Sequence, residues 1–235
     1  MLSAAAWAGL AASTLLIGAA LGVELRVSKR MLGLVMGFGA GALIASVSFE
    51  LTEDAFELSG GVPLALGLAL GATAYYVGDL LIDRMGPTKE RADSGLALLL
   101  GATLDGIPES LIIGLSLTLG GSLEIAFLAS VAVSNLPEGF ASANEEREAG
   151  VAKRTIMLRW LAVVVLSAIF GAVGYVLFAH LSSSAVAFTE AFAAGALLTM
   201  VMDTMVPQAF GDAGPTTGLI AVAGFAFAYF LSVAT

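Results

Sequence analysis

The chain alternates between long apolar runs and short polar connections. A helix needs about 20 mostly apolar residues to cross a bilayer, and eight runs of about this length can be marked. They predict an all-α fold, a polytopic membrane helix bundle in which residues 1–235 form a single transmembrane domain. The expected spans lie near 4–23, 31–52, 62–83, 94–117, 123–144, 156–180, 185–207 and 215–234. No basic segment precedes the first run, which indicates a retained span and not a signal peptide.

Basic residues are confined to alternate connections. All ten Lys and Arg residues lie in three connections. These are the connection between the first and second runs, the connection between the third and fourth runs, and the region between or just inside the fifth and sixth runs. With eight spans, these connections share one face of the membrane, and the positive-inside rule makes that face cytoplasmic. The pattern predicts a multi-pass protein of the cytoplasmic membrane with both termini extracytoplasmic.

Two pairs of segments resemble each other. "FGAGALIASVSFELTEDAF", residues 38–56, aligns without gaps to "FAAGALLTMVMDTMVPQAF", residues 192–210, and "DGIPES" in run four matches "SNLPEG" in run five. The members of each pair are predicted to cross the membrane in opposite directions. We interpret this as an inverted 3+2+3 repeat, a device that transporters use to build a midplane site. Chance similarity between Gly- and Ala-rich helices explains "AGAL" but explains a shared Pro-Glu step less well.

Composition agrees with a membrane protein. Hydrophobic residues make up 58% of the chain and charged residues 12%, with mean hydropathy +0.95, whereas about a quarter of a soluble domain is charged. The net charge of −9 is therefore no sign of an acidic solvated surface. The absence of Cys excludes disulfides and thiolate metal sites, and a single His excludes a His-rich metal site. Nothing resembles a nucleotide-binding loop, and we expect no nucleic-acid partner and no resident cofactor.

Carboxylates interrupt two of the apolar runs. An ionised carboxylate inside a bilayer is costly, so it is normally paired, solvated or functional. Residues i and i+4 share one helix face, and a short link joins runs four and five, so two polar clusters can lie side by side. The candidate metal ligands are Asp105 and Glu109 on run four and Ser134, Asn135 and Glu138 on run five.

The two clusters have no basic partner. Within the predicted spans the only Lys or Arg is Arg159, near a membrane surface. A bound cation or protons must therefore supply the countercharge. Pro108 and Pro137 are predicted helix-kink residues, because a proline in a helix clashes with the carbonyl of residue i−4 and frees it. Protonated acids that only hydrogen-bond helices together are the alternative, and that alternative suits a lone acid better than two matched Pro-Glu steps.

Other polar residues form a candidate pathway. Glu50 and Asp54 belong to an acidic group at the outer end of run two, which could attract cations or simply be a solvated helix end. Asp203 lies well inside run seven, and Gln208 aligns with Asp54 in the repeat.

The Pro-Glu motifs resemble those of the ZIP (Zrt/Irt-like) metal transporters, and the chain is similar to bacterial members over essentially its whole length. Eight spans, external termini and an inverted repeat are what this resemblance implies for the fold. It also implies a site for zinc or a similar divalent ion between runs four and five. By position, the resemblance implies a first site with the ligands Asp105, Glu109 and Glu138, and a second site to which Asn135 would belong. It also implies that the metal is transported inward.

This chain departs from the family pattern at its histidines. Asp105 stands where the family has His, and Ser134 stands where it has His or Gln. Gly106 replaces the family's Asn, and Ser110 replaces its Gly. One well-formed site is therefore expected. Oxygen ligands suit Mg²⁺, Mn²⁺, Ca²⁺ or Fe²⁺, whereas imidazole suits Zn²⁺, although zinc also accepts carboxylates. The sequence leaves open which metal is the substrate.

Two other functions remain as alternatives. The missing histidines fit a transport-inactive paralogue that acts as a metal sensor or structural protein. An intramembrane hydrolase is a remoter alternative, since "YYVGDLL" lacks a full Gly-x-Gly-Asp pattern and no His follows the "EER" pair. We expect a protein that is not an enzyme, with the divalent metal and the lipid bilayer as partners, and a homodimer is left open.

Overall fold

The computed structural model describes residues 1–25, 27–84, 96–118, 125–179 and 181–234, without the side chains of 82–84, 96–105, 125, 126 and 145. This part of the chain is all-helical and contains no strand, which confirms the predicted class. Eight continuous helical segments are present within it: α1 (Leu2–Glu24); α2 (Lys29–Ser46) with η1 (Val47–Thr52) and α3 (Glu53–Ser59); α4 (Gly61–Arg84); α6 (Leu96–Thr118); α7 (Ile125–Glu148); α8 (Lys153–Phe178); α9 (Ser183–Met200) with η2 (Val201–Met205) and α10 (Val206–Ala213); and α11 (Thr216–Ala234).

Six segments are long and apolar enough to cross a membrane, counted over the described residues. They are Leu2–Glu24, Lys29–Ser59, Gly61–Leu81, Lys153–Phe178, Ser183–Ala213 and Thr216–Ala234. α6 and α7, which carry the Pro-Glu steps, are not among them. The described apolar part of α6 is only Gly106–Thr118, and polar residues from Ser134 onward lower the hydropathy of α7.

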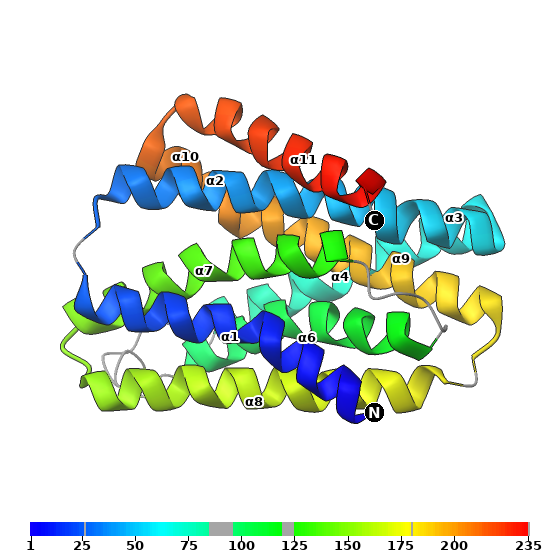
Figure 1. Ribbon diagram of the computed structural model, residues 1–235, viewed down its shortest axis with the longest axis horizontal. Helices are drawn as coiled ribbons and strands as arrows, with labels where there is room; N and C mark the ends of the chain where they lie inside the picture. The colour runs from blue at the N-terminus through cyan, green and yellow to red at the C-terminus, as the bar shows by residue number, and fades with distance from the viewer. Residues whose placement is uncertain (26, 85–95, 119–124, 180, 235) are drawn as a thin grey trace.

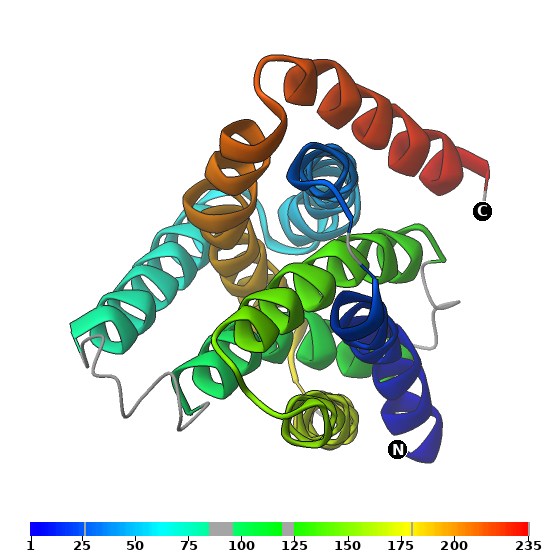
Figure 2. The ribbon, with the colours of Figure 1, turned by 90° about the vertical axis from the view of Figure 1, so that its left-hand side faces the viewer.

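The helices form a bundle with two central members. α2 and α9 are the most buried segments, and α4, α8 and α11 are among the most exposed. α4 packs on α9 and α11 on α2, while α1 packs on α7, α6 on α8, and α1 on α8. Seen end-on, α4 and α11 lie at opposite edges of the bundle (Figure 2). α2 runs from left to right in Figure 1 and α9 in the opposite direction.

The two repeated segments share irregular backbone as well as sequence. The helix changes from α to π at Val47 in one segment and at Val201 in the other, which are aligned positions. Each segment ends at an aligned glycine, Gly60 with φ 77° and Gly214 with φ 67°. Positive φ is readily adopted by glycine alone, so these residues end both helices in the same way. The π turns have no signature in the sequence, and π bulges are frequent at functional sites.

Aligned glycines also bring the helices into close contact. A Cβ atom at Gly41 of α2 would overlap the carbonyl oxygen of Ala221 on α11, and one at Gly195 of α9 would overlap that of Leu68 on α4. Small residues let helix backbones approach closely in lipid, where packing replaces the hydrophobic effect as the driving force. The glycines therefore hold α4 and α11 against the two central helices.

We expect Gly41→Ala to lower the free energy of unfolding by about 1–3 kcal/mol, because the added methyl group forces α2 and α11 apart. The measurement is thermal unfolding of the purified protein in detergent. Gly211→Ala is the matched control, since a Cβ there meets nothing within 4 Å and alanine favours helix over glycine. Equal stability of the two variants would contradict the assigned contact.

Candidate metal site between α6 and α7

The Pro-Glu steps lie within continuous helices. α6 runs through Pro108 and α7 through Pro137, although each proline removes one backbone donor. Glu109, next to Pro108, is 5% exposed, and Asn135, near Pro137, is 4% exposed. Burial of a charged carboxylate is unfavourable unless it is paired or coordinated, so the position of Glu109 requires a partner of some kind.

Glu109 and Asn135 line one small cavity. α6 and α7 contact each other little, and α1 and α8 cover the space between them. The cavity measures about 10 Å³, roughly the volume that one water molecule needs. Its apolar wall comes mainly from α1. Its polar lining consists of Glu109 and Ser110 from α6, Asn135 from α7 and Ser167 from α8. The structure thus brings one residue of each predicted cluster, Glu109 and Asn135, to a common space that Ser110 and Ser167 also line.

The other predicted ligands lie differently. Glu138 is half-buried and is not part of the cavity lining. Ser134 is buried, and its hydroxyl donates to the carbonyl oxygen of Val131 at 2.9 Å. Asp105 falls within the bounds of α6, but its side chain lies outside the described residues. Among the residues that are described, no three His, Cys, Asp or Glu side chains come together, so the ligand set Asp105, Glu109 and Glu138 stays a prediction.

The candidate pathway residues are spread over both repeated segments. Glu50 is buried on η1, while Asp54 on α3 and Gln208 on α10 are half-buried. Asp203 on η2 is exposed, whereas the cavity between α6 and α7 is enclosed by buried side chains. None of the four residues lines that cavity. Their role in a pathway therefore stays a prediction.

Sequence reasoning missed two buried polar features. Glu190 on α9 is 6% exposed, and the signal that singled out Asp203, an acid inside an apolar run, would also have found it. Ser46 on α2 and Ser130 on α7 share a hydrogen bond of 2.8 Å between their hydroxyl oxygens. Such hydrogen bonds join helices in lipid, and this one ties α7 to a central helix. A lone serine in an apolar run gives no indication of its partner.

A group of charged residues joins α1, α7 and α8 at one end of the bundle. Arg159 Nη1 of α8 lies 2.5 Å from Glu146 Oε2 of α7, and both side chains are largely buried. Lys153 Nζ lies 2.6 Å from Glu24 Oε1 in an exposed pair. Arg147 Nε donates to the carbonyl oxygen of Val23 at 3.2 Å. The buried pair is the one expected to affect stability, since exposed pairs contribute little.

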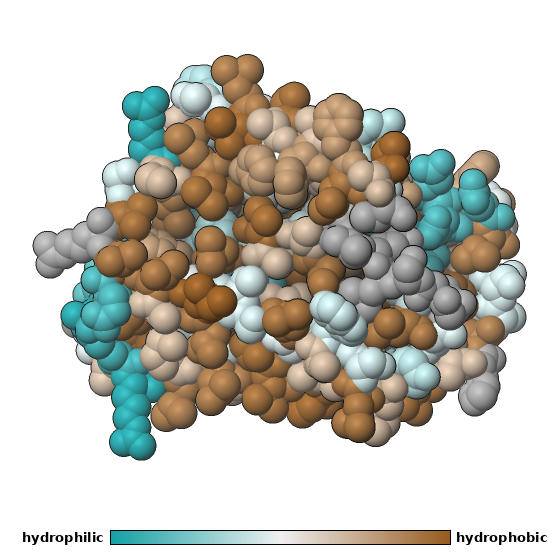
Figure 3. All heavy atoms as spheres, viewed as in Figure 1, coloured by the Kyte–Doolittle hydropathy of each residue, from teal (hydrophilic) through white to brown (hydrophobic). Residues whose placement is uncertain are grey.

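Hydrophilic residues gather at the two ends of the molecule. Figure 3 shows them at both ends of its long axis, with a largely hydrophobic region between them. The connections between α1 and α2 and between α7 and α8 lie together at the left-hand end of Figure 1. The described Lys and Arg side chains, Lys29, Arg30, Arg147, Lys153, Arg154 and Arg159, all belong to or flank these two connections.

Comparison with known proteins gives one informative similarity. Over 192 residues, 78% of the chain, the sequence is 29% identical to an Arabidopsis thaliana protein named "Putative zinc transporter". The match covers 31% of that protein, so this chain spans about a third of its length. No protein-family model matches the chain. Together with the six apolar helices, the similarity indicates a multi-pass membrane protein.

Proposed function

We propose that this protein is a ZIP-type transporter of divalent metal ions, of the bacterial kind, that moves zinc or a related ion such as Mn²⁺, Fe²⁺ or Mg²⁺ across the cytoplasmic membrane. The observation that carries the proposal is the buried polar cavity in which Glu109 of one Pro-Glu helix meets Asn135 of the other. The similarity to a protein named as a zinc transporter supports the same conclusion from outside the site.

The oxygen donors at this cavity suit a divalent cation. Glu109 supplies a carboxylate, Asn135 an amide carbonyl, and Ser110 and Ser167 hydroxyl groups. Asp105 and Glu138 would complete the ligand set from the adjacent turns of the same helices. Carboxylate and carbonyl oxygens bind Mg²⁺, Ca²⁺ and Mn²⁺, and zinc also accepts carboxylates. The ion is the transported substrate, and the resting cavity of about 10 Å³ would have to open to admit it.

Alternating access is the transport mechanism that the internal symmetry favours. The aligned segments run in opposite directions (Figure 1), and each begins its π turn at the same aligned position. Close glycine contacts are reciprocal, α2 with α11 and α9 with α4. These features support an inverted 3+2+3 repeat, in which one half rocks against the other around a central site.

The proposed orientation places the end with the basic residues in the cytoplasm. Connections rich in Lys and Arg face the cytoplasm in multi-pass proteins, and the six basic side chains named above lie at or beside two connections at that end. Eight spans then leave both termini on the opposite side. α6 and α7 would be the two spans that are sheltered by α1 and α8 and tolerate polar residues for that reason.

Metal uptake into liposomes tests the proposed function. Purified protein is reconstituted, and the internal concentrations of Zn²⁺, Mn²⁺, Fe²⁺ and Mg²⁺ are followed with time against protein-free liposomes. We expect uptake of at least one ion. Metal binding without flux of any ion would favour the transport-inactive sensor. Glu146, one member of the "EER" pair, is already engaged by Arg159, which argues against a catalytic role in the hydrolase alternative.

A further inference from the structure

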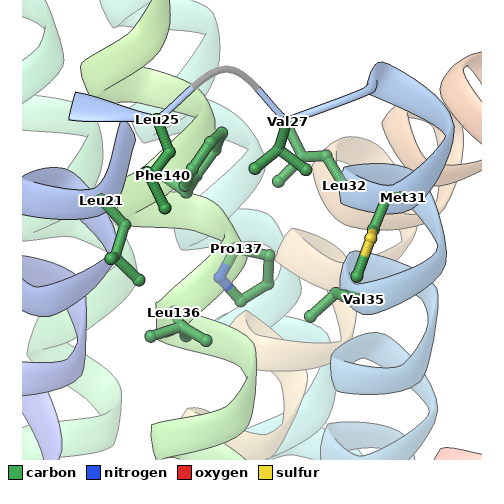
Figure 4. A pocket seen from close by; sticks show the side chains of 9 residues that line it. All are labelled: Leu21, Leu25, Val27, Met31, Leu32, Val35, Leu136, Pro137 and Phe140. Atoms are coloured by element: carbon green, nitrogen blue, oxygen red, sulfur yellow. The ribbon is translucent and has the colours of Figure 1, made fainter. Parts of the chain in front are cut away.

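An apolar groove lies between α1, α2 and α7. It measures about 210 Å³, and its nine lining residues are Leu21, Leu25, Val27, Met31, Leu32, Val35, Leu136, Pro137 and Phe140. Figure 4 shows these side chains around a common space between the end of α1, the beginning of α2 and the middle of α7. Among the described residues, only apolar side chains line this space, so the groove suits a hydrocarbon.

Close helix contacts form the boundaries of this groove. Cβ atoms at Gly18 and Gly22 of α1 would overlap carbonyl oxygens of α7, and a Cβ at Gly39 of α2 would lie 2.8 Å from the Cα of Ser134 on α7. α7 is therefore packed directly on α1, and it meets α2 at Gly39. The groove lies between α2 and α7 on the side of Gly39 that faces the connection from α1, where the two helices are not in such close contact.

Two basic residues adjoin one lining segment of the groove in the sequence. Lys29 and Arg30 immediately precede the lining residue Met31 in the first turn of α2, and both are exposed. Neither forms an ion pair with the residues that the structure describes. Several lining residues at this end are themselves exposed, among them Met31 at 59% and Leu25 at 49%. The groove thus combines an apolar interior with two exposed basic residues that immediately precede one of its lining segments.

We propose that this groove binds one acyl chain of an anionic phospholipid, whose headgroup is held by Lys29 and Arg30. Basic residues beside a membrane surface attract anionic lipids, and long cationic side chains extend to the interface from helix ends. The volume is below the roughly 300–1,000 Å³ of sites for drug-sized ligands. It accommodates part of a single chain and excludes a partner helix. The site does not depend on the proposed transport function.

The apparent affinity for phosphatidylglycerol, measured by native mass spectrometry of the full chain titrated with the lipid, tests the proposal. Lys29→Gln with Arg30→Gln is expected to weaken binding about 25-fold, fivefold for each interfacial charge removed. Val35→Phe fills the groove and is expected to weaken lipid binding about 15-fold, as if two methylene groups lost their burial. Val27→Phe, at the exposed rim, is a second filling variant that disturbs helix packing less.

Matched controls separate this site from general attraction to the membrane. Lys153→Gln with Arg154→Gln removes the same charge at the same end of the bundle, and Val222→Phe adds a ring at a valine that is 68% exposed on α11. Both are expected to bind phosphatidylglycerol as the unmodified protein does. The proposal is overturned if both groove-filling variants keep full affinity, or if the Lys153 and Arg154 pair matters as much as Lys29 and Arg30.

Discussion

Replacement of Glu109 by alanine is expected to reduce divalent-metal flux by about 100-fold. Glu109 is the buried carboxylate of the cavity between α6 and α7. Loss of a residue that only supports a metal ligand costs about 10–100-fold in affinity or activity, so loss of Glu109 as the proposed anionic ligand is expected to reach the upper end of that range. The measurement is the initial rate of uptake into liposomes for the ion that the unmodified protein transports best.

Companion variants make this result specific. Glu109→Gln keeps the size of the side chain but removes its charge, and the same loss is expected. Glu148→Ala removes an exposed acid at the end of α7 and should leave the rate unchanged. If Glu109→Ala transports the ion at the rate of the unmodified protein, the cavity is not part of the transport pathway. A loss in Glu138→Ala as large as that in Glu109→Ala would indicate that both Pro-Glu steps bind the ion in a second conformation.

Replacement of Arg159 by methionine is expected to lower the free energy of unfolding by about 3–5 kcal/mol. Glu146 would then keep a buried charge without its guanidinium partner, and removal of one member of a buried pair has this cost. The side chains are 14% and 7% exposed and lie 2.5 Å apart, so water screens them poorly. Thermal unfolding in detergent can be followed by the fluorescence of Trp160, which is 1% exposed and adjacent to Arg159.

The double variant Glu146→Gln with Arg159→Met distinguishes a lost ion pair from lost packing. It removes both charges, and most of the stability should return, since uncharged partners of similar volume often replace a buried pair without cost. Lys153→Gln breaks only the exposed pair with Glu24 and should leave the stability essentially unchanged, because water screens an exposed pair. A double variant no more stable than Arg159→Met would assign the effect to packing.

Helix positions followed from hydropathy, but helix ends did not. The run predicted near 31–52 continues as helix to Ser59, and the run near 185–207 continues to Ala213. The length of an apolar run reflects the thickness of the bilayer, because only the residues inside the bilayer need to be apolar. A helix can continue beyond the bilayer until a residue ends it. Here Gly60 and Gly214, with positive φ, end the two segments. Polar residues such as Glu53 and Asp54 support helix and mark no boundary.

The candidate site was predictable in part for a similar reason. Spacing along one helix indicated that Asn135 and Glu138 share a face, because it depends only on helical periodicity. Which turn of α7 meets Glu109 depends on the position of α7 along its axis relative to α6. Contacts at Gly18 and Gly22 fix α7 against α1, and in this arrangement Asn135, not Glu138, lines the cavity.

The amino-acid sequence by itself determined the all-helical class, the apolar segments, the paired Pro-Glu steps and the concentration of basic residues in alternate connections, because each depends on composition or on periodicity within one segment. Only the tertiary structure decided the cavity shared by Glu109 and Asn135, the buried pair of Glu146 and Arg159 and the apolar groove beside Pro137. Each of these joins residues from separate helices. Their meeting depends on how closely glycines let the helix backbones approach, and no single segment contains that information.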